Sequence, residues 1–110
     1  MSKWTIEYYD QSLQDWIKAL PIGIRADFAR LTELLEEFGV LRLPHSRAMG
    51  DGLFELRPKG KEGIARVFYC MLIGKKIVLL HGFIKKTQKT PQNELKKAIR
   101  RMKEVKSEQK

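Results

Sequence analysis

The sequence is poor in residues that bind metals or form disulfides. One cysteine, Cys70, and two histidines, His45 and His81, occur among 110 residues. A single cysteine cannot form an intrachain disulfide, which fits a reducing compartment, and we expect Cys70 to be a core residue. Neither histidine has a second histidine or a cysteine at ligand spacing. We therefore expect no metal site, no cofactor and no nucleophilic triad.

Long hydrophobic runs are also missing. No stretch approaches the ~20 apolar residues of a membrane-spanning helix, and the opening MSKWTIEYYD lacks the apolar segment of a secretion signal. We expect a cytoplasmic protein without membrane contacts. The glycines form neither a Walker nor a dinucleotide-binding pattern, and 110 residues are too few for a Rossmann or barrel enzyme. The length predicts one domain over residues 1–110.

Negative charge is scarce, above all near the end of the chain. The sequence has 22 lysines and arginines against 13 acidic residues, a net charge of +9. Residues 1–83 hold 12 basic and 10 acidic side chains, whereas residues 84–110 hold 10 and 3. A concentration of positive charge indicates a polyanionic partner, with nucleic acid before a membrane surface. A solvated basic tail would explain the same charge equally well.

Apolar residues recur at helical spacing in three segments. The first follows an expected N-cap at Ser12 and ends before Pro21. The second continues from Pro21 to a cap at Gly39, and we expect these two helices to form a hairpin. The third begins at Pro91 after a Thr90 cap and reaches about residue 106. This last helix is basic, and its apolar stripe is formed by Leu95, Ala98, Ile99, Met102 and Val105.

Strand patterns occur at residues 4–9, 53–57, 64–73 and 76–86. The last is apolar on both alternating faces, so we expect it to be a central strand. Val40–Gly52 contains breakers and is expected to be a surface loop, whereas Pro58–Gly63 and Gly74–Lys75 are expected turns. The element order predicts an α+β fold. It would have a mostly antiparallel sheet of about four strands, the helix hairpin on one face and the C-terminal helix apart from it.

Cations gather where three of these strands end or begin. Arg57 ends one strand, Arg66 lies early in the next, and Lys85 and Lys86 close the last. In an antiparallel meander these positions meet at one end of the sheet. Arg66 is expected to face solvent there, and with few carboxylates nearby the cations would suit phosphate. The plain alternative is that strand ends are ordinary places for charge.

Three strings in the sequence carry a resemblance to a known family. Residues 52–57 read GLFELR, residues 66–69 read RVFY, and residues 80–91 read LHGFIKKTQKTP. Together with Glu94, Ala98 and Arg101 they resemble the phage Gp49-like, HigB-type branch of the RelE/ParE toxin superfamily. The resemblance implies the compact RelE-like fold and a type II toxin that cuts mRNA on the ribosome without a metal ion. It also implies a cognate antitoxin, usually a helix-turn-helix protein, that holds the toxin inactive.

The resemblance assigns Arg57 and Arg66 to the scissile phosphate, and Lys85 and Lys86 to charge stabilisation or proton transfer as the RNA 2′-OH attacks. His81 lies ~13 Å along the strand from Lys85 and is expected to be structural. Two alternatives remain: a ParE-like toxin that poisons DNA gyrase, a branch that generally lacks such a cationic cleft, and a non-catalytic RNA-binding module. Further RNA contacts are expected from Lys59, Lys61, Lys89, Lys97 and Arg101.

Overall fold

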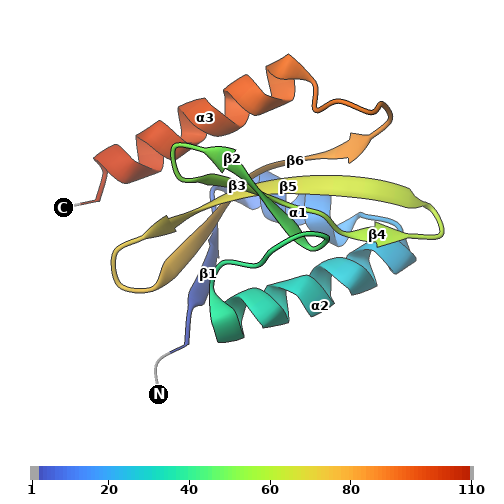
Figure 1. Cartoon of the computed structure of the whole chain (residues 1–110), viewed down its shortest axis with the longest axis horizontal. Helices are drawn as coiled ribbons and strands as arrows, with labels where there is room; N and C mark the ends of the chain where they lie inside the picture. Colours follow the sequence, from blue (N-terminus) through green and yellow to red (C-terminus); the bar gives the residue numbers. More distant parts are fainter. Residues whose placement is uncertain (1–2, 110) are drawn as a thin grey trace.

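A mixed β-sheet separates two layers of helix in the computed structural model, which describes residues 3–109 (Figure 1). The strand order is β1-β6-β5-β3-β2, and β4 pairs with β5 outside this path. Every pair is antiparallel except β1 with β6. The strands are β1 (Thr5–Tyr8), β2 (Ser46–Gly50), β3 (Leu53–Leu56), β4 (Lys59–Gly60), β5 (Gly63–Leu72) and β6 (Lys76–Lys85).

The α+β class, the mostly antiparallel pairing and the central place of β6 are confirmed, but the expected number of about four strands is wrong. The sheet has six strands. One extra strand, β4, lies within the segment expected to be a turn, and another, β2, lies within the segment expected to be a loop. The sequence pattern of β1 shows a strand without showing its partner, and the parallel pairing with β6 joins distant parts of the chain.

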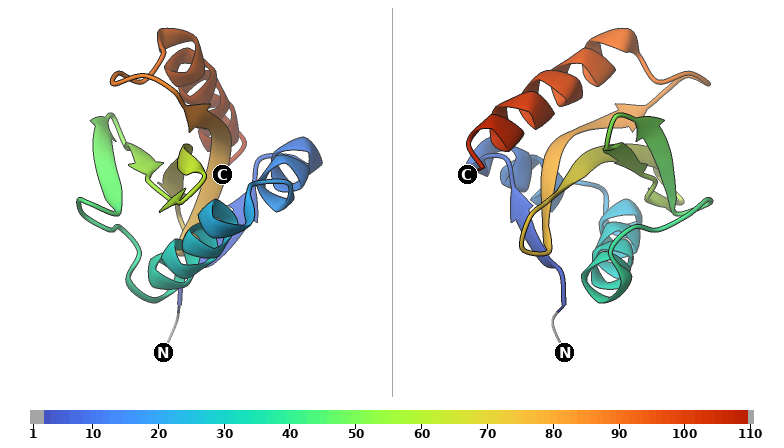
Figure 2. Two further views of the ribbon diagram at one scale, coloured as in Figure 1. Left: turned by 90° about the vertical axis from the view of Figure 1, so that its right-hand side faces the viewer. Right: turned by 60° about the vertical axis from the view of Figure 1, so that its left-hand side comes forward.

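The helices are α1 (Gln11–Lys18), α2 (Ile22–Phe38) and α3 (Gln92–Ser107). Helix α3 covers one face of the sheet, and α2 lies across the sheet from it, as both views in Figure 2 show. Helix α1 packs on β1 and β6, while α2 packs on β1, β4 and β5. The expected helix hairpin does not match the structure in detail, because each helix packs mainly on strands. The two helices still share one core, and Arg25 of α2 donates a 2.9 Å hydrogen bond to the Lys18 carbonyl of α1.

Alternating side chains of β5 enter two separate cores. Val67 and Tyr69 pack with the apolar residues of α1 and α2. Phe68 and Cys70 pack on the opposite face with Ala98, Met102 and the rest of the expected α3 stripe. The prediction that Cys70 is a core residue is confirmed. On the α1 side the backbone of β6 is so close that any side chain at Gly82 would collide with the ring of Trp16.

Two of the expected helix caps are wrong. Asp10, and not Ser12, caps α1, because its carboxylate accepts a 2.9 Å hydrogen bond from the Leu13 amide. The chain turns into the helix directly after β1, which places the cap two residues earlier. Pro91 occupies the cap position of α3, and the Thr90 side chain bonds elsewhere. The cap at Gly39 is confirmed, with φ of 81°.

The segment Val40–Gly52 is only partly a loop. Its second half forms β2, an edge strand whose register against β3 is irregular between Ala48 and Gly50. An edge strand tolerates such a bulge because only one side is paired. Ser46 at its start is buried and shares a 2.6 Å hydrogen bond with the Tyr69 hydroxyl. This hydrogen bond links the edge strand β2 to the central strand β5.

The hairpin between β5 and β6 is confirmed, although its loop is longer than expected. Leu72 pairs with Lys76, which leaves three residues, 73–75, in the connection instead of two. Within residues 3–109 no helix combines the length and the hydrophobicity that a membrane crossing requires.

Candidate functional site

Glu55 occupies the centre of the charged end of the sheet. Its Oε1 lies 3.5 Å from Arg57 Nη1 and 3.5 Å from Arg66 Nε, and its Oε2 accepts a 2.9 Å hydrogen bond from the Thr90 hydroxyl. The register of β3 against β5 explains this arrangement. Leu56 pairs with Val67 at the end of this antiparallel register. Arg57 follows Leu56 and Arg66 precedes Val67, so the two arginines lie at neighbouring positions on adjacent strands.

Arg66 is buried, which makes the expectation of a solvent-facing arginine wrong. Its side chain is 4% exposed and that of Glu55 is 1% exposed. Arg66 Nη1 donates a 2.9 Å hydrogen bond to the carbonyl of Ala65, whereas its Nε has no hydrogen-bond partner within the described residues. Burial lowers the pKa of Arg66, the charge of Arg57 lowers it further, and Glu55 opposes both. The buried carboxylate of Glu55 thus neutralises part of the positive charge of Arg57 and Arg66.

Two more cations surround this ion pair. Arg47 lies directly opposite Glu55 on β2, and opposite residues of paired strands point to the same face. Lys85 ends β6 on the strand beside Arg66. We call Arg47, Arg57, Arg66 and Lys85, with Glu55 among them, the cationic cluster. It joins four cations to one anion and keeps a positive excess suited to phosphate.

The surroundings of Lys85 affect the proton affinity of its side chain. Burial lowers the pKa of its ammonium group, and the positive charges of Arg66 and Arg57 lower that pKa further against the opposing effect of Glu55. A lysine with a lowered pKa releases its proton more easily near neutral pH. Such a group can act in general acid–base catalysis.

A pocket of about 380 Å³ opens beside the two arginines. It lies between α2, the segment that precedes β2, and the β4–β5 hairpin. Its wall combines charged and apolar side chains: Asp27, Arg30, Leu43, Pro44, His45, Arg57, Lys59, Ile64 and Arg66.

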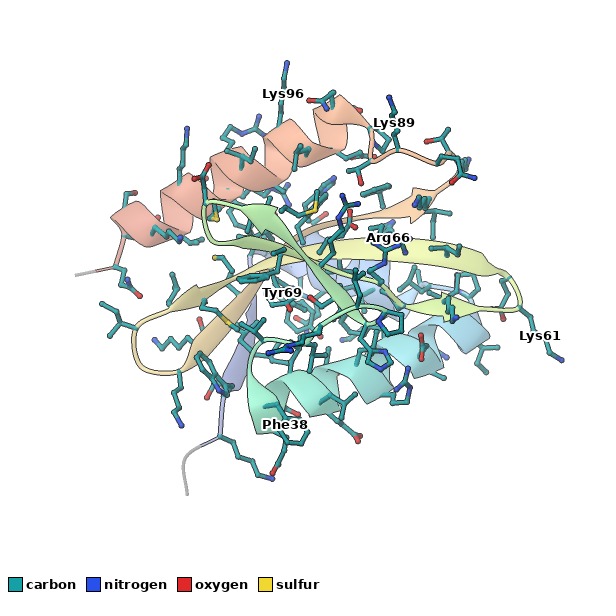
Figure 3. The ribbon with its side chains drawn as sticks, viewed as in Figure 1. Phe38, Lys61, Arg66, Tyr69, Lys89 and Lys96 are labelled. Carbon is teal, nitrogen blue, oxygen red and sulfur yellow. The ribbon has the colours of Figure 1, made fainter. Side chains whose placement is uncertain are left out.

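The remaining residues expected at the site lie outside the cluster. Lys86 follows the end of β6 and lines a different hollow, together with Trp16 and His81. Lys61 lies at the outer tip of the β4–β5 hairpin and Lys89 lies on the loop before α3, both away from Arg66 (Figure 3). Of the four expected catalytic cations, the fold therefore brings together Arg57, Arg66 and Lys85.

His81 is held by contacts of its own. Its Nε2 lies 2.6 Å from Glu94 Oε1, and its ring stacks on Phe68 with centroids 6.5 Å apart. Burial lowers the pKa of His81, and the positive charges of Lys97 and Arg101 act in the same direction, whereas Glu94 opposes them. These contacts fit the structural role expected for this residue.

Arg101 of α3, one of the expected RNA contacts, also makes contacts within the fold. Arg101 donates a 2.8 Å hydrogen bond to the carbonyl of Leu80, and its guanidinium lies 4.3 Å from the centroid of the Tyr9 ring. Lys97 and Arg101 both line a small hollow facing α1. Arg101 is therefore held by contacts within the fold while it stays partly exposed, and its expected contact with RNA remains a prediction. The exposed cations of this helix are Lys96, Arg100, Lys103 and Lys106.

Four residues near the site were missed by sequence reasoning: Glu55 and Thr90 as partners, Arg47 as a cation, and His45 in the pocket wall. Glu55 and Thr90 stand within the family-like strings, but only the fold shows that they touch. Arg47 was not predicted as a site residue, because the segment that forms its strand, β2, is expected from the sequence to be a loop. Among residues 3–109 no group of three or more histidine, cysteine or acidic side chains is placed to hold a metal ion.

Comparison with protein families identifies a relative of this chain. The model of a family described as phage-derived Gp49-like proteins (DUF891) matches residues 15–103. The matched span contains the whole cationic cluster and the neighbouring pocket. No curated protein matches the chain.

Proposed function

This chain belongs to the phage-derived Gp49-like family, part of the superfamily of toxins from toxin–antitoxin systems, and we propose that it is a ribosome-dependent mRNA endoribonuclease. Family membership implies an antitoxin partner, for which we propose a helix-turn-helix protein. The observation that carries the proposal is the cationic cluster, because phosphoryl chemistry on RNA requires positive charge and a group that moves protons. Activity on ribosomes would place the protein in the cytoplasm.

The RNA supplies its own nucleophile in the proposed reaction. The 2′-OH loses its proton, its oxygen forms a bond to the adjacent phosphorus, and the bond from phosphorus to the 5′-oxygen breaks. The products are a 2′,3′-cyclic phosphate and a 5′-hydroxyl, which receives a proton. This route needs stabilisation of the extra phosphorane charge and two proton transfers, all of which basic side chains can supply without a metal ion.

We assign these tasks to residues of the cluster from their exposure and, for Lys85, from its lowered pKa. Arg57 is 23% exposed and presents a planar guanidinium that can hold two phosphate oxygens. Arg66 is buried beside it, so we assign it to the electrostatic field and to the position of the Glu55 carboxylate. Lys85, whose pKa is lowered by burial and by the two arginines, is the proposed proton-transfer group. Lys86, Lys59, Lys61 and Lys89 are proposed contacts to the RNA backbone on either side.

The test is primer extension on a message translated in vitro in the presence of the protein. We expect codon-phased cuts with the wild type and a roughly tenfold to hundredfold lower cutting rate with Arg57→Ala, the loss of one charged hydrogen-bond partner. Lys76→Ala, a cation at the opposite end of β6, should cut at the wild-type rate. Unchanged cutting by Arg57→Ala would contradict the assigned site.

The same assay distinguishes the two alternative functions. A ParE-like toxin would leave the message intact and change the supercoiling of DNA in a gyrase reaction. A non-catalytic RNA-binding module would do neither and would only retain RNA on the protein. Either result would contradict the proposed nuclease.

A further inference from the structure

The pocket beside the cationic cluster has two chemically different walls. Leu43, Pro44 and Ile64 form an apolar side, and Arg57 and Arg66 form part of the charged side. Leu43 is 63% exposed and Ile64 is 39% exposed, so neither side chain serves the core. Large apolar side chains that stay in water around a concave site are typical of a ligand surface.

We propose that this pocket binds one nucleotide of single-stranded RNA, with the base on the apolar wall and the phosphate on Arg57. A nucleotide carries both an apolar ring face and an anion, which matches the two walls. The volume of about 380 Å³ lies at the small end of the range for ligand pockets, roughly 300–1,000 Å³. That size suits a single unstacked nucleotide rather than a double helix, and unstacked bases are the usual targets of RNA recognition.

The hydrogen bonds already made by the polar groups of the pocket indicate which of these groups can bind the edge of the base. Asp27 is already engaged, because its Oδ1 accepts hydrogen bonds of 2.8 and 3.0 Å from Arg30 and its Oδ2 accepts the Lys59 amide at 2.9 Å. His45 differs, since its imidazole has no hydrogen-bond partner within residues 3–109. We therefore assign His45 to hydrogen bonding with the base edge.

The backbone links this base site to the proposed phosphate site. The amide of Arg57 donates a 2.9 Å hydrogen bond to the carbonyl of His45. The residue that would hold the phosphate and the residue that would read the base are thus fixed relative to one another. The inference rests on the proposed function, because it takes the cluster as a site for RNA phosphate.

The test compares two anionic probes by fluorescence competition. One is a short single-stranded RNA with 2′-O-methyl groups, which cannot be cut by its own 2′-oxygen, and the other is inorganic polyphosphate of equal charge, which has no bases. We expect wild type to prefer the RNA by at least tenfold, a modest value for one base on a protein surface. Leu43→Ser and Ile64→Ser should lose this preference and keep their affinity for polyphosphate.

A matched control comes from the opposite end of the sheet. Ile73 is 77% exposed on the β5–β6 loop, so Ile73→Ser removes a similar side chain from a surface away from the pocket. It should keep the full preference for RNA. His45→Ala should change the order of affinities for the four homopolymeric RNAs while its affinity for polyphosphate stays the same. Circular dichroism checks that each variant is folded.

The outcomes separate this inference from the proposed nuclease. If wild type cuts mRNA and Leu43→Ser and Ile64→Ser bind and cut like wild type, the base site is wrong and the nuclease stands. If wild type cuts no mRNA but its preference for RNA depends on Leu43, the nuclease is wrong and the base site stands. Equal affinity of wild type for RNA and polyphosphate would overturn the base site.

Discussion

Glu55 holds the cationic cluster together, because its two carboxylate oxygens contact Arg57, Arg66 and Thr90. We predict that Glu55→Ala lowers the free energy of unfolding by roughly 3–5 kcal/mol, since it leaves the Arg66 charge buried without its partner. Urea denaturation followed by circular dichroism measures this loss. Glu33→Ala, at an exposed position of α2, should change stability by less than about 0.5 kcal/mol. Equal stability of the two variants would contradict the role of Glu55.

The same contacts decide which arginine is the better probe of activity. Arg66→Ala would leave Glu55 buried beside a cavity, so a loss of RNA cutting by this variant would not distinguish a lost site from a lost fold. Arg57 is 23% exposed and its removal leaves the closer-packed Arg66 in place. For this reason the functional test above uses Arg57→Ala.

Cys70 provides a second prediction for a single residue. Burial raises the pKa of its thiol to about 11, and only the thiolate reacts with alkylating reagents. We predict that iodoacetamide at pH 8 leaves the folded protein unmodified and labels it once in urea, because the chain has one cysteine. Mass spectrometry reads the result directly. Rapid labelling of the folded protein would show that the α3 face of the sheet opens.

At the scale of the element, α3 presents two basic surfaces with different roles. Lys96 and Arg100 are exposed, whereas Arg101 is engaged with Leu80 and Tyr9. We predict that Lys96→Glu with Arg100→Glu keeps the stability of wild type and weakens co-sedimentation with ribosomes. The salt dependence of binding should become shallower, because fewer phosphate contacts release counterions. Arg101→Glu should instead lower stability by roughly 1–3 kcal/mol. Undiminished co-sedimentation of the double variant across a salt titration would rule out docking through this surface.

The apolar side of α3 supports a further comparison. Met102 is 5% exposed within the second core, while Leu95 is only partly buried against it. We predict that Met102→Ala costs about 2–5 kcal/mol of unfolding free energy and that Leu95→Ala costs less. Thermal unfolding of the two variants gives the comparison. A larger loss for Leu95→Ala would place the centre of this core nearer the N-terminus of the helix.

At the scale of the whole molecule, we expect the net charge of +9 to speed association with the antitoxin that family membership implies. Long-range attraction to an acidic surface speeds the encounter, and salt screens it over about 10 Å at 0.1 M. We predict that the association rate falls between low and high salt while the dissociation rate changes less. Stopped-flow mixing with the purified antitoxin measures both rates. An association rate independent of salt would contradict electrostatic recognition.

The sequence by itself determined the elements whose signals are local. The spacing of apolar residues predicted α2 and α3, the alternation predicted β3, β5 and β6, and apolar residues on both faces predicted the central place of β6. Cys70 was identified as a core residue from its apolar neighbours alone. These features follow from periodicity and burial, which depend on residues close together in the chain.

Tertiary structure decided which side chains meet. The parallel pairing of β1 with β6, the edge position of β2 and the contact of Thr90 with Glu55 join residues that are far apart in sequence. The sequence placed Arg57, Arg66 and Lys85 at one end of the sheet, but it did not show the carboxylate between the arginines. A local sequence pattern indicates which face of a strand or helix a side chain occupies. Which side chain it contacts on another strand depends on the strand order and the register of the sheet. The charge of the site could be predicted, and its ion pairs could not.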